Sequence, residues 1–220
     1  MIPLSDASRR PSRAPVVTFL IIFINAVVFV LEILGGQEFV LQWSVVPARI
    51  MAGQGLVTIL TAMFMHGGLA HILGNMIFLR AFGPEIEDAM GPVKFLGFYI
   101  IGGLVATVAQ VVMDPMSVIP NLGASGAIAS VMGAFLITYP RDRIKTVIFL
   151  GWYVTVRMIP AGLLVGFWFL TQLFSEIGAV ARVQHGGVAY MAHIGGFITG
   201  MVTARLFEDP RRLTYRRLDE

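Results

Sequence analysis

One serine of this chain lies between glycines, in surroundings that suit a catalytic residue. Ser125 lies between Gly123 and Gly126, where an apolar segment begins. Glycines on both sides let the backbone turn sharply and let another chain come close. The first N–H groups of a helix are unpaired and carry partial positive charge, which suits a developing oxyanion. The alternative from this short motif alone is a helix N-cap, in which Ser125 only accepts a backbone hydrogen bond.

A histidine near the end of the chain also lies among glycines. His193 precedes Gly195, Gly196 and Gly200. Gly196 and Gly200 form a G-x-x-x-G face, which permits close contact between helices. Gly196 is one helical turn from His193, so we expect a partner helix close to the imidazole. The alternative is a histidine whose only bond is to a backbone carbonyl, although polar side chains in a membrane are usually functional.

A second pair of polar residues, His71 and Asn75, occurs at helical spacing. The i, i+4 separation places both side chains on one helix face. Both can donate hydrogen bonds, and an oxyanion needs donors held in a water-poor site. The alternative is a hydrogen-bonded contact between helices. His66 precedes two glycines and is interpreted as structural, and His185 is interpreted as an incidental residue of an outer loop.

A metal site is the competing interpretation of the histidines. His66, His71 and His193 could supply three nitrogens, as in some zinc enzymes. The sequence has no H-E-x-x-H motif, and the neighbouring halves of these segments contain no acidic residue. We therefore predict no metal and no cofactor. The absence of cysteine excludes disulfides and thiol catalysis.

The composition indicates that a lipid bilayer surrounds these residues. The chain of 220 residues is 56% hydrophobic and 13% charged, whereas about a quarter of an ordinary soluble domain is charged. Six apolar segments are predicted as helices, at about 16–34, 69–82, 95–113, 125–139, 160–174 and 191–207. The stretch 144–159 is interrupted by Arg157 and is expected to be a loop at the membrane surface. The fold class is therefore all-α, a polytopic bundle of six transmembrane helices.

Basic residues predict the orientation. With six spans, one side of the membrane receives both tails and nearly all of the Lys and Arg residues, and the other side receives only Arg49 and Arg182. The side richer in Lys and Arg is normally cytoplasmic. Both termini are therefore expected in the cytoplasm. The pI of about 9.6 reflects these short basic tracts, so nucleic-acid binding is not expected.

This topology brings the candidate site residues together. The second, fourth and sixth helices all run from outside to inside, so His71, Asn75, Ser125 and His193 fall in the outer leaflet. A helix over 125–139 is about 22 Å long, shorter than the roughly 30 Å hydrocarbon core. Ser125 should then lie below the outer surface. The preceding loop must then dip into the membrane, where it must be covered by protein or line a wet cavity, because unpaired backbone is not tolerated in lipid.

Three regions are expected along the chain. Residues 1–14 are predicted to be a disordered cytoplasmic tail, 15–207 the membrane domain, and 208–220 a charged cytoplasmic tail. The first apolar segment follows three arginines but is longer than the apolar part of a signal peptide, so it is interpreted as a retained helix.

The combination of motifs resembles the rhomboid family of intramembrane serine proteases. The run from His66 through His71 to Asn75 is similar to the family's H-x-x-x-x-H-x-x-x-N signature, and the sequence around Ser125 is similar to its G-x-S-G. Ala192-His193-Ile194-Gly195-Gly196 with Gly200 resembles the A-H-x-x-G-x-x-x-G of its last helix. Phe82-Gly83 with Glu87 and Gly91 resembles the short loop after its second helix. The resemblance covers about residues 50–207.

The resemblance implies a role for each residue. Ser125 would be the nucleophile and His193 its general base, while His71, Asn75 and the backbone N–H of Ser125 would stabilise the oxyanion. His66 and Glu87 would be structural, as would the glycines of the motifs (Gly123, Gly126, Gly196 and Gly200). Some relatives carry a tyrosine that packs on the histidine. The corresponding residue is Ala129, so another side chain must support the ring of His193.

The resemblance also implies the activity, which is hydrolysis of peptide bonds in or near transmembrane segments of membrane-protein substrates by a Ser-His dyad. The expected partners are such substrates and the lipid bilayer. The expected location is the cell inner membrane, with the active site open to the outer side. The alternatives are an inactive relative that binds membrane clients, which the presence of both Ser125 and His193 disfavours, and a small transporter. The transporter is disfavoured because no polar path reaches the cytoplasmic half.

Overall fold

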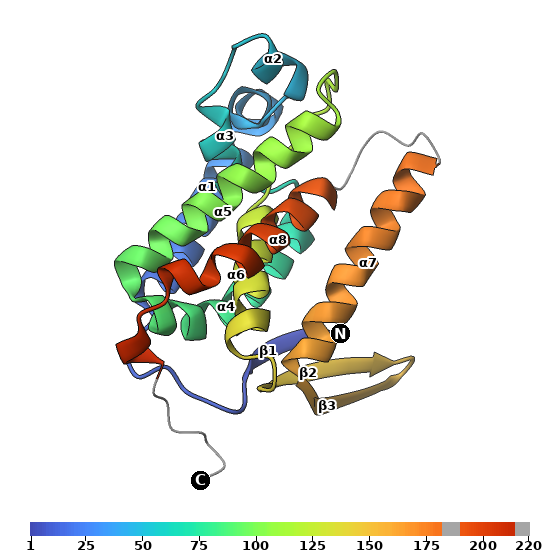
Figure 1. Ribbon diagram of the computed structural model, residues 1–220. Helices are drawn as coiled ribbons and strands as arrows, with labels where there is room; N and C mark the ends of the chain where they lie inside the picture. The colour runs from blue at the N-terminus through green and yellow to red at the C-terminus, as the bar shows by residue number, and fades with distance from the viewer. Residues whose placement is uncertain (182–189, 214–220) are drawn as a thin grey trace.

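The computed structural model of the protein describes residues 1–181 and 190–213. They form a mostly helical bundle, and a helix covers each of the six apolar segments (Figure 1). These helices are α1 (Val16–Trp43), α4 (Leu69–Met90), α5 (Pro92–Met113), α6 (Ser125–Thr138), α7 (Ala161–Ala181) and α8 (Tyr190–Phe207). The shorter ones are α2 (Pro47–Met51), α3 (Thr58–Thr61) and the 3₁₀ turns η1 (Ala62–Phe64) and η2 (Pro210–Arg212). Arg182 and His185 lie outside the described residues.

Three of these helices extend beyond their predicted ends, and α7 continues past Phe174 to Ala181. α1 continues past Leu34 to Trp43, with a kink at Gly36, whose φ of 61° and ψ of −155° are not helical. α4 continues through Pro84 to Met90, so the short loop predicted at residues 82–91 is wrong. All residues from Ala81 to Met90 are buried, and this burial holds the segment helical although it contains a proline.

Helix α6 is the centre of the bundle. It is 14 residues long, about 21 Å, and every residue from Gly126 to Phe135 is buried. In Figure 1 it lies among α4, α5, α7 and α8. Because protein surrounds α6, its short length leaves no backbone exposed to lipid, and its first residue can lie inside the bundle.

Glycines let α6 and α8 touch backbone to backbone. A Cβ on Gly196 would overlap the carbonyl oxygen of Gly126, and one on Gly200 would overlap that of Ser130. In the other direction, a Cβ on Gly133 would overlap the carbonyl oxygen of Phe197. Small residues at such crossings allow close packing in membrane proteins. The partner helix expected beside His193 is therefore α6, the helix that begins at Ser125.

Gly200→Val is expected to lower the free energy of unfolding by about 3 kcal/mol, because the added atoms meet a backbone carbonyl that cannot rotate away. The control is Gly97→Val on α5, where a Cβ would meet no atom within 4 Å. Thermal unfolding of both purified variants in detergent measures the difference. Equal melting temperatures for the two variants would show that the α6–α8 crossing tolerates bulk.

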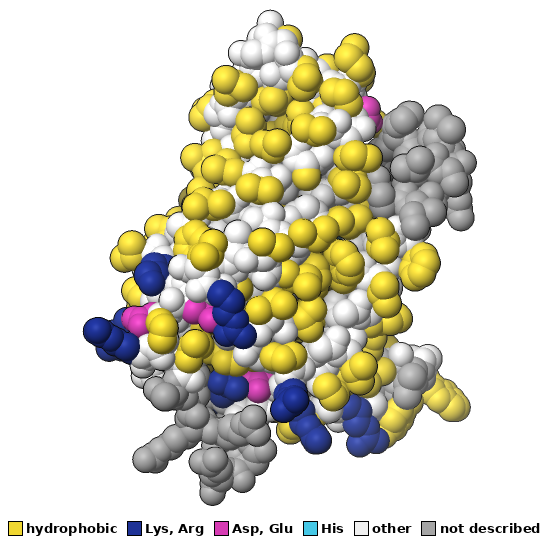
Figure 2. Space-filling view, in the orientation of Figure 1, with side chains coloured by type: hydrophobic (Ala, Val, Ile, Leu, Met, Phe, Trp, Pro, Cys, Tyr) yellow, Lys and Arg dark blue, Asp and Glu magenta, His cyan; other side chains and the backbone are white. Residues whose placement is uncertain are grey.

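The exterior of the bundle is apolar. By length and composition, α1 and α5 could each cross a membrane. A third span results if residues Thr58–Phe64 (α3 and η1) and α4 are counted as one segment, which is bent by 88°. Large hydrophobic side chains are exposed along α1, among them Phe23 at 64% and Leu34 at 78%. In Figure 2 such side chains cover most of the visible face, and Lys and Arg gather at its lower end. This distribution is typical of a protein embedded in lipid.

A small antiparallel sheet lies below α7 at that end of the molecule (Figure 1). Strands β1 (Ile2–Asp6), β2 (Arg143–Leu150) and β3 (Tyr153–Pro160) pair in the order β1-β2-β3. The all-α prediction is therefore wrong in this respect, since the segment interpreted as a surface loop forms a hairpin. The segment is rich in β-branched and aromatic residues. Gly151, with a φ of 61°, supplies the left-handed residue that a tight turn needs.

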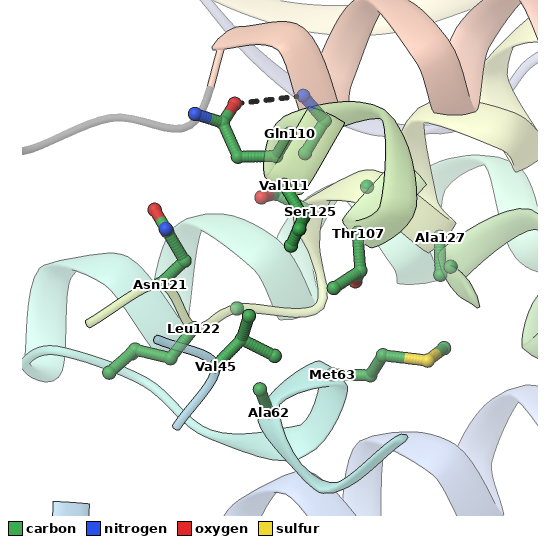
Figure 3. Close-up of a pocket in the computed structure, with 14 residues that line it drawn as sticks. Val45, Ala62, Met63, Thr107, Gln110, Val111, Asn121, Leu122, Ser125 and Ala127 are labelled. Carbon is green, nitrogen blue, oxygen red and sulfur yellow. Dashed lines mark hydrogen bonds between the residues drawn. The ribbon is translucent and has the colours of Figure 1, made fainter. Parts of the chain in front are cut away.

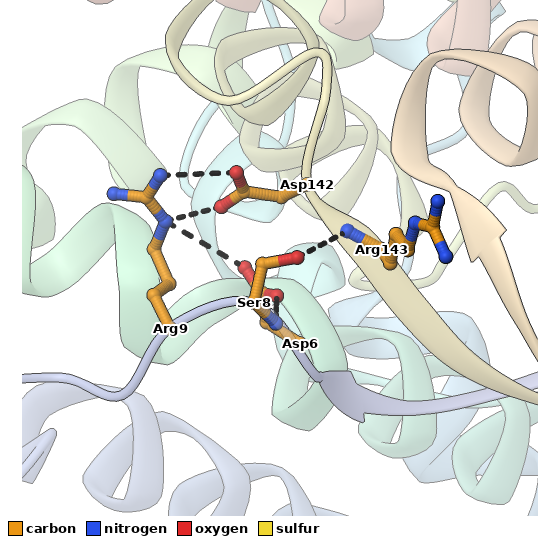
Figure 4. Close-up of polar contacts among 5 residues, drawn as sticks. All are labelled: Asp6, Ser8, Arg9, Asp142 and Arg143. Carbon is orange, nitrogen blue, oxygen red and sulfur yellow. Dashed lines mark hydrogen bonds and ion pairs between the residues drawn. The ribbon is translucent and has the colours of Figure 1, made fainter. Parts of the chain in front are cut away.

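The predicted disorder of residues 1–14 is also contradicted. β1 pairs with β2 from Ile2↔Val147 to Asp6↔Ile144. The guanidinium of Arg9 binds both carboxylate oxygens of Asp142 (Figure 4). It also lies 3.8 Å from the ring centre of Tyr139. Further along, the N–H and hydroxyl of Ser12 donate to Asp88 at 2.6 and 2.9 Å. The order of this polar segment comes from tertiary ion pairs and strand pairing, which its composition does not reveal.

Protonation of Asp6 is expected to stabilise the docked N-terminal segment. Burial raises the pKa of Asp6 to about 7, and the nearby Asp142 carboxylate adds to this, while Arg9 opposes it. The unfolded chain loses this proton near pH 4, so stability declines as pH rises from about 4 to about 7. Asp6→Asn should weaken that dependence, as measured by melting temperatures at pH 5 and pH 8. The control is Glu38→Gln, an exposed carboxyl. An unchanged pH dependence in Asp6→Asn would contradict the prediction.

Candidate active site

Ser125 and His193 are in direct hydrogen-bond contact. Ser125 is the first residue of α6, and His193 is the fourth residue of α8. The glycine-mediated crossing places these two helix starts side by side, and Nε2 of His193 lies 2.7 Å from Oγ of Ser125. A nucleophile and its base must be within about 2.6–3.2 Å. The pair therefore has the geometry for proton transfer from the hydroxyl to the imidazole.

The other ring nitrogen of His193 contacts a residue that the sequence analysis missed. Nδ1 lies 2.7 Å from Oε1 of Gln172 on α7. An amide oxygen only accepts hydrogen bonds, so Nδ1 carries the proton and Nε2 presents its lone pair to Ser125. The available signal was a polar residue in the otherwise apolar fifth segment.

Aromatic rings complete the support of the imidazole. The ring of Trp168 on α7 lies 5.8 Å from that of His193, and the ring of Tyr190 lies 6.5 Å away and edge-on. Ala129, in the position where some relatives carry a tyrosine, is buried inside α6. The supporting side chains sought for His193 are thus Gln172 and two aromatic residues on α7 and α8.

His71 lies against the turn that leads into Ser125. Its Nδ1 accepts a hydrogen bond from the N–H of Gly67 at 3.3 Å, so Nε2 carries the proton. A Cβ on Gly123 would lie 3.0 Å from this Nε2 and 3.5 Å from the hydroxyl oxygen of Ser125. Gly123 also has a φ of 137°. Glycine is therefore required here both for the backbone conformation and for the close approach of His71.

Asn75 presents an unused donor. The residue is 9% exposed, and its Nδ2 has no hydrogen-bond partner among the described residues. A buried amide group without a partner is costly, and an asparagine that only joins two helices would have its amide paired. The free donor therefore favours a role toward a ligand over a role in packing.

A cavity of about 540 Å³ connects these groups. His71, Asn75, Ser125, Gln172 and His193 supply its polar groups, and Phe78, Ile128, Met132 and Trp168 supply apolar walls. The walls come from α4, α6, α7 and α8. Such a volume is typical of a ligand pocket with a few convergent polar groups.

A second and much smaller cavity reaches Ser125 from another side (Figure 3). Its volume of about 30 Å³ is enough for about two water-sized probes. Thr107, Gln110 and Asn121 supply polar atoms to its lining. Gln110 accepts a hydrogen bond from the backbone N–H of Ala192 at 3.3 Å, which ties α5 to the start of α8. Polar groups therefore surround Ser125 on two sides.

His66 lies under the site and makes no bond to Ser125 or His193. The backbone N–H of His66 donates to both carboxylate oxygens of Glu32 on α1, at 2.9 and 3.1 Å. Its ring is buried and edge-on to that of His71, with ring centres 5.1 Å apart. These contacts fit the structural role predicted for His66. Glu32 was missed, although a carboxylate inside an apolar segment was a usable signal.

Glu87 joins two helices at the opposite end of the bundle. Its carboxylate accepts hydrogen bonds from the N–H groups of Val17 and Thr18 at 2.9 and 2.7 Å, and from the Thr18 hydroxyl at 2.7 Å. These are the unpaired donors at the start of α1, where a negative charge is favourable. Glu87 is thus distant from the cavity and contacts the first turn of α1.

The three histidines considered for a metal site differ in the contacts of their rings. Within residues 1–181 and 190–213, no group of three or more His, Cys, Asp or Glu side chains could hold a metal ion. Nδ1 of His71 is occupied by Gly67, and both ring nitrogens of His193 are occupied by Gln172 and Ser125. Both ring nitrogens of His66 are buried and have no hydrogen-bond partner among the described residues.

The fold and the site define a class, a membrane-embedded helical bundle with a hydrogen-bonded serine and histidine beside a cavity. The profile of the Rhomboid domain matches residues 53–209. The chain therefore belongs to the rhomboid family. It is 29% identical to "Rhomboid protease GluP" of Bacillus subtilis (strain 168) over 211 residues. The aligned region covers 94% of this chain and 38% of that protein.

Two other relatives are similar at the same level. "Putative rhomboid protease YdcA" of Bacillus subtilis (strain 168) is 30% identical over 124 residues, 56% of this chain and 61% of that protein. "RHOMBOID-like protein 6, mitochondrial" of Arabidopsis thaliana is 27% identical over 160 residues, 73% of this chain and 45% of that protein. The chain thus matches only about half of the length of these relatives.

Proposed function

We propose that this protein is an intramembrane serine protease that hydrolyses peptide bonds in or near the transmembrane segments of other membrane proteins. The observation that carries the proposal is the 2.7 Å contact between Nε2 of His193 and Oγ of Ser125, in a cavity lined by both polar and apolar side chains. Family membership supports it, because similar proteins bear the name of rhomboid proteases. An inactive relative would have no need of an aligned serine and histidine.

The reaction proceeds in two halves. Oγ of Ser125 attacks the scissile carbonyl carbon while Nε2 of His193 takes the hydroxyl proton. His193 then gives this proton to the leaving amine, and an acyl-enzyme remains. Water attacks the ester in the second half, and His193 again acts first as base and then as acid. Each half restores the neutral imidazole.

The negative oxygen of each tetrahedral intermediate needs donors. The Nε2–H of His71, the Nδ2 of Asn75 and the N–H of Ser125 are the groups at the cavity that can supply them. Donors fixed in place before the reaction stabilise the developing charge at little reorganisation cost. The unpaired state of Asn75 supports this assignment.

We further propose that α1 and α4 to α8 cross the cell membrane, with both termini in the cytoplasm and the cavity open to the outer half. The gathering of Lys and Arg at one end of the molecule supports this orientation. A substrate helix must unwind before its backbone reaches Ser125, so poor helix formers near the scissile bond favour cleavage. Reporters fused to either terminus read the orientation.

The decisive experiment is cleavage of a reporter transmembrane substrate by the purified protein in lipid vesicles, compared with Ser125→Ala. Cleavage that requires Ser125, survives EDTA and is blocked by a fluorophosphonate supports the proposal. Substrate binding without turnover by the wild-type protein would favour the inactive client-binding alternative.

A further inference from the structure

Helix α7 supplies a polar contact that the Ser125–His193 chemistry does not by itself require. In Figure 1, α7 stands at the side of the bundle. Its Gln172 faces the cavity, and the amide oxygen lies 2.7 Å from Nδ1 of His193. The amide nitrogen donates to the hydroxyl of Thr171 at 3.3 Å, and that hydroxyl donates to the carbonyl of Trp168 at 2.6 Å. This chain of bonds directs the amide oxygen toward the imidazole.

We propose that Gln172 is a positioning residue that holds His193 as the Nδ1–H tautomer and so makes its Nε2 the base for Ser125. The proposal rests on the serine-protease function proposed above. In triads an acidic side chain has this task, and the wrong tautomer there is strongly damaging to kcat. Here a neutral amide takes the same place.

The donor and acceptor inventory makes this role specific. A neutral imidazole carries its proton on either nitrogen, and only the Nδ1–H form can accept the serine proton at Nε2. The titratable groups facing His193 within the described residues are His71 on α4 and Tyr190 on α8, and neither bonds to Nδ1. Trp168 and Tyr190 contact the ring only through their faces and edges. Gln172 is therefore the described residue that selects the tautomer.

The contact with Gln172 makes the tautomer of His193 depend on the packing of α7. Ser125 and His193 are held by the rigid α6–α8 crossing, whereas the acceptor for Nδ1 comes from α7. Displacement of α7 from α8 would remove that acceptor and leave both tautomers accessible. His193 is thus fully prepared as a base only while α7 is packed in this position.

The test compares four variants of the full-length protein in lipid vesicles. Gln172→Ala and Gln172→Leu both remove the acceptor, and Leu keeps most of the volume. Both should lower kcat by about 10- to 100-fold, since a buried donor loses its partner. Gln172→Glu restores an acceptor and should retain activity at high pH. Its acidic limb should move to higher pH, because the carboxylate favours the imidazolium. Leu170→Ala, an exposed residue of α7, is the matched control.

The result that overturns the inference is a kcat within about twofold of wild type in both Gln172→Ala and Gln172→Leu, with an unchanged pH profile. Comparable losses in Leu170→Ala would also overturn it, because they would indicate a general disturbance of α7. Cleavage that depends on Ser125 while the Gln172 variants behave normally refutes this inference alone. Cleavage that does not depend on Ser125 refutes the function.

The tautomer of His193 can also be measured directly, without substrate and independently of turnover. In protein with ¹⁵N-labelled histidine, the His193 ring should show a proton on Nδ1 in the wild type, identified by comparison with His193→Ala. In Gln172→Leu the ring should show a mixture of tautomers. The same tautomer in both proteins would overturn the inference, whatever their activity.

Discussion

Ser125→Ala is expected to lower kcat for cleavage of a transmembrane substrate by at least about 10⁴-fold. Removal of the nucleophile in serine proteases costs about 10⁶ in kcat, and what remains comes from binding and the oxyanion donors. Since no other described residue is placed to replace the hydroxyl beside His193, no alternative covalent route remains. His193→Ala should be nearly as severe. The double variant should be no worse than either single one, because the two residues act as a unit.

Folding should survive Ser125→Ala. The side chain makes its contact with His193 at the edge of a cavity, and its loss opens no packed core. Ser130→Ala is the matched control, because Ser130 is buried on the same helix and donates only to the carbonyl of Ala127 at 2.7 Å. We expect Ser130→Ala to keep kcat near that of wild type. The measurement is the initial rate of product formation at saturating substrate, with the melting temperature of each sample. Appreciable turnover by folded Ser125→Ala would remove the serine-protease assignment.

Asn75→Ala is expected to lower kcat by about 10²–10³-fold, the usual effect of removing one donor from an oxyanion site. The loss should be smaller than that of Ser125→Ala, since His71 and the backbone N–H of Ser125 remain. Because Nδ2 of Asn75 has no hydrogen-bond partner within residues 1–181 and 190–213, its removal leaves no buried group of these residues newly unpaired. The melting temperature should therefore change little.

The measurement for Asn75 is kcat and melting temperature on the same purified sample. If Asn75 only joined helices, Asn75→Ala would lower the melting temperature and leave kcat of the folded fraction almost unchanged. That result would remove Asn75 from the oxyanion site without affecting the Ser125–His193 pair. Asn75→Asp, which keeps the shape but loses the two N–H donors, is the stricter variant and should be at least as impaired.

The apolar segments of the sequence are enough to predict that a lipid bilayer surrounds this protein and where its long helices lie. Its apolar segments are long and interrupted by few charges, and a chain of that kind must satisfy its backbone internally. For that reason a helix covers each predicted segment in the structure. The spacing of His71 and Asn75 determined that they share one helix face, and Gly196 and Gly200 determined where another helix could approach. These are local properties, set by helix periodicity and by the absence of a Cβ.

Tertiary contacts decided what local patterns leave open. Most of residues 5–14 are polar or small, yet strand pairing of β1 with β2 and the Arg9–Asp142 ion pair order residues 1–14. The hairpin of β2 and β3 is apolar enough to be interpreted as part of a membrane surface. Its strands pair with each other, and β1, which is more than 130 positions away in the sequence, adds a third strand to the sheet.

The same distinction holds at the site. The motifs indicated Ser125 and His193, but only the crossing of α6 and α8 brings Nε2 to within 2.7 Å of the hydroxyl. Gln172 and Glu32 belong to no motif that we used, because their partners are distant in the sequence: His193 lies on α8, and His66 lies in the loop before α4. A hydrogen bond between residues far apart in sequence depends on helix packing and on the rotation of each helix about its axis. One sequence predicts which residues are polar within a span, and the packed structure decides which of them meet.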